Sequence, residues 1–252
     1  MKKPWLIAAA SMLGLAMSPA TDLEAAELRM LAGGSTVGWM NQLAPQFEHA
    51  SGHRLVIHFD STPNLIKQAT SSAPFDLAVV PVDVFKDEAA KARFIPGPTK
   101  NIARVGYGIV VRSGVPKPDI GTPDALKRTL LDAPSIAFVP ESAAGAYILR
   151  TFDRLGIAEA MKAKTRPQTA PAQIAPAVAK GEAELGIFLM NVLIAPGVEL
   201  AAPFPAELQQ ELVFTAAVAA DSQQAEAARA FIDFLTTPAA ADVIKAKGMI
   251  PG

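Results

Sequence analysis

Serine and threonine hydroxyls gather at three turns where an apolar segment, typical of a buried strand, gives way to the start of a helix. The residues concerned are Ser35, Thr36, Ser61, Thr62 and Ser142. The first turn of a helix has free backbone N–H groups and the positive end of the helix dipole, so a small anion is a natural ligand there. The alternative is that these hydroxyls only cap their helices. Their repetition at three turns favours a site of neutral donors, which would discriminate against anions that need an acceptor.

The elements that must position these turns alternate between strand and helix. Apolar runs and helical spacing predict strands at 28–32, 54–59, 76–80 and 135–139, and helices at 36–50, 63–70 and 146–155. This order is typical of an α/β fold with mixed, mostly parallel sheets flanked by helices. In such sheets ligands bind at the carboxyl ends of the strands, where the turns converge.

A change of character between residues 104 and 108 predicts that the chain passes there into a second lobe. Strand 212–218 is expected to return it to the first. We therefore expect residues 27–103 together with 216–252 to form lobe 1, and residues 104–215 to form lobe 2. If the turns come from both lobes, the ligand lies in the cleft between them and its binding favours closure.

The first twenty residues have the pattern of a cleavable secretory signal. Lys2 and Lys3 precede an apolar run from Trp5 to Met17, which is too short to cross a bilayer comfortably. Small residues precede the expected cleavage after Ala20, and cleavage after Ala25 or Ala26 is the alternative. Residues 1–20 are therefore interpreted as a signal peptide, and the periplasm is the expected location.

Composition excludes several classes of function. The 252 residues include 23 basic and 24 acidic ones, and the two lysines lost with the signal peptide would bring the net charge from −1 to −3. This charge argues against nucleic acid as a partner. The absence of cysteine excludes disulfides and thiolate metal sites. The three histidines, His49, His53 and His58, lack the spacing of metal ligands, so neither a metal nor a cofactor is expected.

Six short segments recur in an order that points to a family. They are Leu-Ala-Gly-Gly-Ser at 31–35, Phe-Asp-Ser-Thr at 59–62, Ser-Ala-Pro-Phe-Asp at 72–76, Ala-Ala-Gly-Ala-Tyr at 143–147, Gly-Glu-Ala-Glu-Leu-Gly-Ile at 181–187 and Ala-Phe-Ile-Asp-Phe-Leu at 230–235. In this order the chain resembles the periplasmic molybdate-binding proteins of ABC importers over nearly its whole mature length. The resemblance implies the two-lobe, Venus-flytrap fold of periplasmic binding proteins and capture of a small anion for importer membrane subunits. A monomer is expected.

The resemblance also implies how the anion would be held. Within that family an oxyanion is bound without cations, by one serine in the first turn, one in the second, and backbone N–H groups in the Ala-Gly turn. These roles correspond to Ser35, to Ser61 with Thr62 beside it, and to Ala144.

One position departs from the family pattern. Leu189 stands where the family has a tyrosine, so an anion-binding hydroxyl is missing. Tyr107, Met190 and Asn191 are the residues expected to alter the pocket in its place. Divergent members that resemble this chain include an aconitate isomerase, which moves a proton between carbons of a tricarboxylate.

An isomerase would need groups that a simple anion carrier does not. Carboxylates favour a cationic contact, for which Arg104 and Lys67 are the candidates, and proton transfer needs a base, for which Glu141 and His58 are the candidates. Each of these four also suits an ordinary solvated position. The sequence thus predicts an anion-binding protein with no catalytic residue, with an isomerase on the same scaffold as the alternative and a sensor domain as a weaker one.

Overall fold

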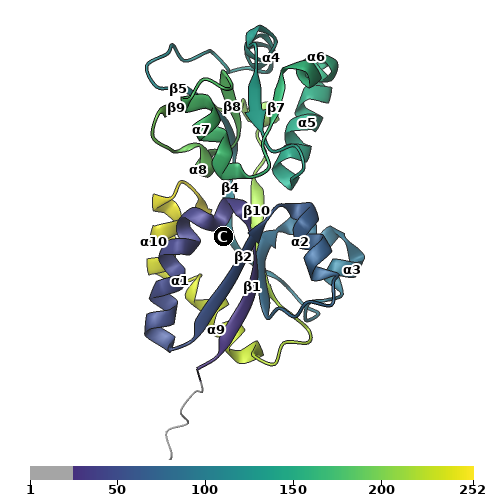
Figure 1. Cartoon of the computed structure of the whole chain (residues 1–252), viewed down its shortest axis with the longest axis vertical. Helices are drawn as coiled ribbons and strands as arrows, with labels where there is room; N and C mark the ends of the chain where they lie inside the picture. Colours follow the sequence, from purple (N-terminus) through teal and green to yellow (C-terminus); the bar gives the residue numbers. More distant parts are fainter. Residues whose placement is uncertain (1–24) are drawn as a thin grey trace, which may run out of the picture.

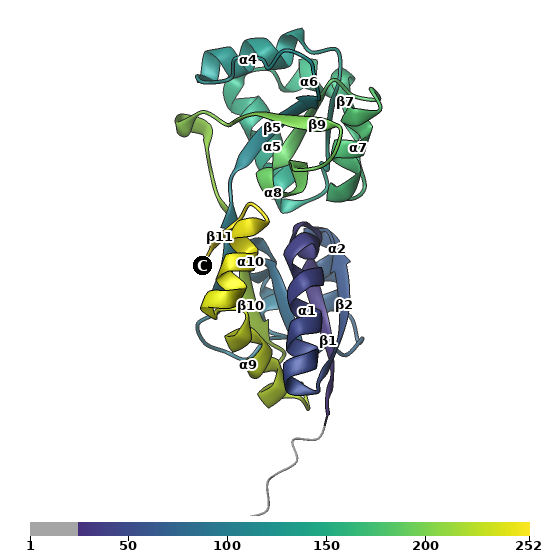
Figure 2. The same ribbon diagram turned by 90° about the vertical axis from the view of Figure 1, so that its left-hand side faces the viewer.

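The computed structural model describes residues 25–252, and the expected signal peptide lies outside them. Two lobes are stacked along the long axis, each a β-sheet flanked by helices (Figures 1 and 2). The α/β class and the two-lobe architecture are therefore confirmed. Among the described residues, no helix combines the length and apolarity needed to cross a membrane.

Lobe 1 is built from both ends of the described chain around a six-stranded sheet of order β11-β4-β10-β3-β1-β2. Helices α1, α9 and α10 cover one face of this sheet, and α2 and α3 cover the other (Figures 1 and 2). The strands are β1 (Glu27–Gly33), β2 (Arg54–Asp60), β3 (Leu77–Pro81), β4 (Lys100–Val105), β10 (Leu212–Val218) and β11 (Ile250–Pro251). The helices are η1 (Gly34–Thr36), α1 (Val37–Ser51), α2 (Thr62–Ala69), η2 (Val82–Lys86), α3 (Glu88–Lys91), α9 (Ala225–Phe234) and α10 (Pro238–Ala246).

Lobe 2 is built from the middle of the chain around a five-stranded sheet of order β7-β6-β8-β5-β9. Helices α5 and α6 lie on one side and α7 and α8 on the other (Figure 1). The strands are β5 (Tyr107–Arg112), β6 (Ile136–Phe138), β7 (Thr165–Pro167), β8 (Leu185–Leu189) and β9 (Val198–Pro203). The helices are α4 (Pro123–Asp132), α5 (Ala143–Leu155), α6 (Ala158–Lys164), η3 (Pro171–Gln173), α7 (Ile174–Ala179), α8 (Met190–Leu193) and η4 (Ala206–Leu208).

Parallel pairing is less dominant than the sequence predicts. Among the described strands four pairings are parallel, β1–β2, β1–β3, β6–β7 and β6–β8, and five are antiparallel. Every antiparallel pairing involves β4, β5 or β10, the strands beside the passages between lobes. These strands are not joined to their neighbours by crossover helices, so the constraint that imposes parallel order does not act on them.

The register of β1 and β2 brings two of the hydroxyl-bearing turns together. The strands run parallel from Glu27 opposite Arg54 to Gly33 opposite Asp60. Their carboxyl ends therefore release η1 and α2 side by side, at the end of lobe 1 that faces lobe 2 (Figure 1).

The chain passes between the lobes twice, from β4 to β5 and from β9 to β10, and the side chain of Gln209 joins these two passages. Its Oε1 accepts a hydrogen bond from the Tyr107 N–H at 2.8 Å, and its Nε2 donates to the Tyr107 carbonyl at 2.9 Å. A Cβ at Gly106 would lie 2.9 Å from that Oε1, so the close approach favours glycine there. The boundaries expected at residues 104 and 216 fall inside β4 and β10, because these strands continue to residues 105 and 212 within the lobe 1 sheet.

The core of lobe 1 reaches the lobe junction through α1. Trp39 is completely buried, and its indole Nε1 donates to Sδ of Met249 at 3.1 Å. Met249 lies between α10 and β11, so this contact joins α1 to the C-terminal turn (Figure 2).

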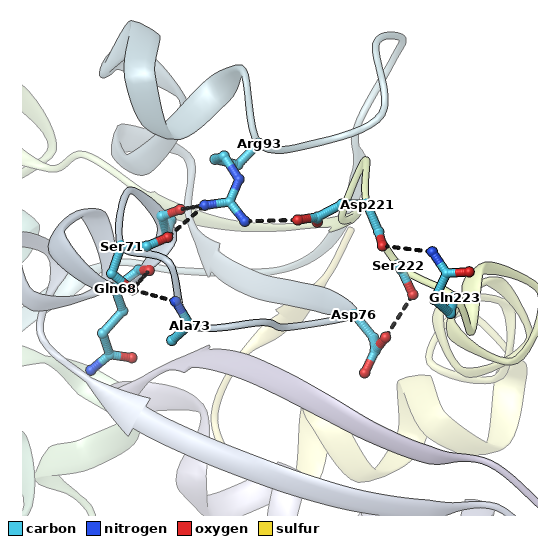
Figure 3. Close-up of polar contacts among 9 residues, drawn as sticks. Gln68, Ser71, Ala73, Asp76, Arg93, Asp221, Ser222 and Gln223 are labelled. Atoms are coloured by element: carbon cyan, nitrogen blue, oxygen red, sulfur yellow. Dashed lines mark hydrogen bonds and ion pairs between the residues drawn. The ribbon is translucent and has the colours of Figure 1, made fainter.

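On the opposite face of lobe 1, the guanidinium of Arg93 links the end of α2 to the segment after β10 (Figure 3). It donates to the carbonyls of Ala69 at 2.9 Å and Ser71 at 2.7 Å, and lies 3.0 Å from Asp221. Its Cζ also lies 5.6 Å from the centre of the Phe75 ring. The end of α2 is thereby tied to the segment that follows β10.

Replacing Arg93 with methionine is expected to lower the free energy of unfolding by about 1–3 kcal/mol, because two carbonyls lose their donor. Urea unfolding of the two proteins measures this difference. Arg229→Met is the control, since Arg229 is exposed on α9 and should change stability by less than about 0.5 kcal/mol. Equal effects of the two substitutions would contradict a structural role for Arg93.

Candidate functional site

The three turns converge where the lobes meet, and two hydrogen bonds join the lobes there. The Ala143 N–H at the start of α5 donates to Thr62 Oγ1 at 3.1 Å. The Asn191 Nδ2 in α8 donates to the Ser35 carbonyl at 2.7 Å. Each bond pairs a residue of lobe 1 with one of lobe 2, so the two lobes are in contact across the site.

The lobe 1 hydroxyls differ in whether they are already used. Thr36, completely buried, donates its Oγ1 hydrogen to the Gly33 carbonyl at 2.8 Å and so closes its own turn. Ser35 is 6% exposed, and Ser61 precedes α2 without capping it. Within residues 25–252 the hydroxyls of Ser35 and Ser61 form no hydrogen bond that meets standard geometry. Among the lobe 1 hydroxyls at these turns, those of Ser35 and Ser61 are therefore left without a partner in the described residues.

The lobe 2 turn offers a backbone donor in place of its hydroxyl. Ser142 Oγ donates to the Val139 carbonyl at 2.8 Å and accepts from the Gly145 N–H at 2.9 Å, so it serves as a helix cap. The Ala143 N–H is bound to Thr62. That leaves the Ala144 N–H without a partner in the described part of the chain. Helix α5 begins at Ala143, three residues earlier than predicted, because Ser142 is its N-cap.

Beside these turns lies a pocket of about 430 Å³ between the lobes. Its lining comes from η1 and the start of α1, from η3 and α8, and from the C-terminal turn after α10. The residues are Gly34, Ser35, Val37, Gly38, Ala172, Asn191, Val192, Ile194, Ala246 and Lys247. Lys247 is the charged residue of this lining and is exposed. Oδ1 of Asn191 is buried and has no hydrogen-bond partner among residues 25–252.

Tyr107 is buried at the junction, outside that lining. Its ring lies 4.7 Å from Tyr147 and 5.8 Å from Phe204, centre to centre. Burial, reinforced by Tyr147 and Asp83, raises the pKa of its hydroxyl. In the β5–β8 pairing Tyr107 stands directly opposite Leu189, so its phenol belongs to the strand beside that position.

The candidate cations and bases lie elsewhere. Arg104 is about half exposed and lies 3.4 Å from Glu211, while Lys67 and Glu141 are exposed. His58 is exposed as well, and its Nε2 lies 3.3 Å from Asp60 Oδ2 and 2.6 Å from Gln68 Nε2. None of the four lines the interlobe pocket. Arg104 and His58 lie beside surface carboxylates, and Lys67 and Glu141 are exposed to solvent.

The carboxyl of Asp60 precedes the second turn and holds it in place. Burial alone would raise its pKa, but hydrogen bonds from Asn64 and the Ser61 N–H, together with His58, lower the pKa below 3.8. Oδ1 accepts from the Ser61 N–H at 2.7 Å and from Asn64 at 2.8 Å. The ionised carboxylate therefore stabilises the turn that presents Ser61.

This lowered pKa predicts a pH dependence. The stabilisation from Asp60 is present above its unfolded-state pKa of 3.8 and is lost as the pH falls through the lower folded-state value. The free energy of unfolding should therefore fall more steeply below pH 3.8 in the native protein than in Asp60→Asn. Urea unfolding at a series of pH values tests this, with the exposed Asp242→Asn as control. Parallel profiles for the native protein and Asp60→Asn would contradict it.

Sequence reasoning missed two parts of this arrangement. The bond between Thr62 and the Ala143 N–H depends on how the lobes close, and Lys247 reaches the pocket because the chain turns back after α10 at Gly248, whose φ is +78°. The glycine after α10 was a signal for the turn, but no residue pattern indicates which surface the turn will meet.

Comparison with known proteins finds relatives that match this chain over nearly its whole length. Residues 28–250 match the family described as bacterial extracellular solute-binding protein. The aconitate isomerase of Pseudomonas sp is 31% identical over 251 residues, which cover 95% of each chain. The molybdate-binding protein ModA of Azotobacter vinelandii is 27% identical over 231 residues, covering 89% of this chain and 90% of that one.

A solved structure agrees with the fold. The periplasmic molybdate-binding protein of Azotobacter vinelandii superposes with a TM-score of 0.72 at 21% identity, covering 88% of this chain and 98% of that one. At this identity the likeness concerns the arrangement of lobes and sheets.

Proposed function

Because the chain belongs to the bacterial extracellular solute-binding protein family, we propose that it captures a small anion between its two lobes and presents it to a membrane importer. The observation that carries this proposal is the set of unpartnered neutral donors at the junction, within the described residues: the hydroxyls of Ser35 and Ser61 and the N–H of Ala144. They come from both lobes and from helix starts, where partial positive charge favours an anion. The signal pattern of residues 1–20 supports a periplasmic location.

The two hydrogen bonds between the lobes indicate that the lobes are closed in this structure. The bonds from Ala143 to Thr62 and from Asn191 to Ser35 exist only when the lobes meet. A ligand that touches donors of both lobes binds the closed form more tightly than the open one, so it shifts the population toward closure. The two passages beside Gly106 and Gln209 are the points at which the lobes can rotate.

A binding panel tests the proposal. The purified chain, without residues 1–20 and stripped of ligand, is heated with molybdate, tungstate, sulfate, cis-aconitate or trans-aconitate. An anion present at 100 times its Kd should stabilise the folded state by about 2.7 kcal/mol and raise the Tm accordingly. A raised Tm with at least one anion supports the proposal. No shift with any of them would reject anion capture from this panel.

A second function, isomerisation of a small tricarboxylate, is favoured by two observations. The aconitate isomerase is 31% identical over 95% of both chains, and a pocket of about 430 Å³ falls in the range of sites for small organic ligands. The step would remove a proton from one carbon and return it to another. Interconversion of cis- and trans-aconitate, followed by proton NMR, tests this function.

The residue that would act as the base in that reaction has to be identified by experiment. Glu141→Gln and His58→Gln address the two sequence candidates, which are both exposed. Isomerase activity that persists in both variants would exclude them as the base, and no activity in the native chain would leave anion capture as the function.

A further inference from the structure

The side-chain amide of Asn191 has a fixed orientation at the lobe junction. Nδ2 donates to the Ser35 carbonyl at 2.7 Å. A carbonyl oxygen only accepts, so a flipped amide would place two acceptors against each other. The NH₂ group must therefore face Ser35, and Oδ1 is the atom that the amide presents on its other side.

That Oδ1 lacks what a buried acceptor requires. In the described chain it is the one buried side-chain nitrogen or oxygen atom without a hydrogen-bond partner. Buried polar atoms are almost always satisfied, and each exception calls for an explanation. Asn191 also lines the interlobe pocket, so a ligand that seats there and moves the atoms now covering Oδ1 would supply the missing donor.

We propose that Asn191 determines specificity by selecting an anion that carries its own hydrogen-bond donor, a hydroxycarboxylate being the chemical class that fits. This inference rests on the proposed function, because it assumes that the anion occupies the interlobe pocket. A fully ionised tetrahedral oxyanion has only acceptors and would be repelled by Oδ1. A hydroxyl donates to Oδ1, while the carboxylate of the same molecule accepts from the Ser35 hydroxyl, which lines the same pocket.

The remaining lining of the pocket agrees with such a ligand. Lys247 brings a positive charge and forms no ion pair among the described residues, so its ammonium can meet a second carboxylate. Val37, Val192 and Ile194 add apolar surface for the carbon skeleton. A pocket of about 430 Å³ also has room for an organic acid.

Matched pairs of acids test the proposal by isothermal titration calorimetry. Citrate and tricarballylate differ by one hydroxyl, as do malate and succinate. The native chain is expected to bind the hydroxylated member of at least one pair about tenfold more tightly, because its partner leaves Oδ1 unsatisfied. Asn191→Leu, of similar volume, should reduce that preference to less than about threefold.

Thr62→Val provides the matched control. It removes the other bond between the lobes and should weaken both members of a pair equally, leaving their ratio unchanged. Equal affinity for both members of each pair in the native chain, tight binding of molybdate or tungstate alone, or a preference that survives in Asn191→Leu would each overturn the assignment. If neither these acids nor any anion of the earlier panel binds, the proposed function itself fails.

Discussion

Replacing Gly145 with alanine is expected to lower the free energy of unfolding by about 3 kcal/mol or more, the upper range for overpacking, and to abolish anion binding. The added Cβ would lie 2.0 Å from the Val139 carbonyl oxygen and 2.4 Å from that of Pro140. Both obstacles are backbone atoms, so no side chain can move aside. The start of α5 would have to shift, and the Ala144 N–H would shift with it.

Urea unfolding and calorimetric titration with the tightest-binding anion of the panel measure the two effects. Gly38→Ala is the stability control, because a Cβ there meets nothing within 4 Å and α1 already has helical geometry. That substitution should stabilise the chain by about 0.4–1 kcal/mol. Unchanged stability and binding in Gly145→Ala would mean that the backbone at α5 can yield and that the anion does not depend on the position of the Ala144 N–H.

Ser35→Ala is expected to weaken binding of the same anion by about 10- to 100-fold, as for loss of one hydrogen bond to a charged group. The hydroxyl is buried at the junction and has no partner within the described residues, so its removal should leave stability nearly unchanged. Calorimetric titration gives the affinity, and urea unfolding gives the stability.

Two other serines separate this role from a general effect of losing a hydroxyl. Ser142→Ala removes a cap and should lower stability by about 1 kcal/mol. Ser113→Ala changes an exposed loop residue and should alter neither property. If Ser35→Ala binds the anion as tightly as the native chain, the hydroxyl does not contact the ligand.

The sequence was sufficient for the features that depend on local patterns. The apolar run ending at Gly33-Gly34 predicted a strand, a turn and a helix, and the structure has β1, η1 and α1 there. The same holds for β2 and α2. The parallel direction of β1 and β2 also agrees with the pattern, since helix α1 between them is the crossover connection that a parallel pair needs.

The roles of individual hydroxyls required the structure. Thr36 and Ser142 have the same local signature as Ser35 and Ser61, yet their hydroxyls are used within their own turns. Which oxygen is left free depends on backbone geometry at each turn, and a residue pattern does not record it. Arg104 shows the same limit: the sequence places it at the passage between lobes, whereas it lies in β4 and its side chain pairs with Glu211.

The contact between Trp39 and Met249 offers an intrinsic fluorescence signal for movement of the lobes. Trp39 is the only tryptophan among residues 25–252, and Met249 directly follows Gly248, where an added Cβ would lie 3.5 Å from Cα of Asn191 in α8. We expect opening of the lobes to end the contact between this turn and α8 and thereby to change the surroundings of the indole. Intrinsic fluorescence therefore reports lobe movement without any label, and stopped-flow mixing can resolve the rates at which a ligand closes and releases the lobes.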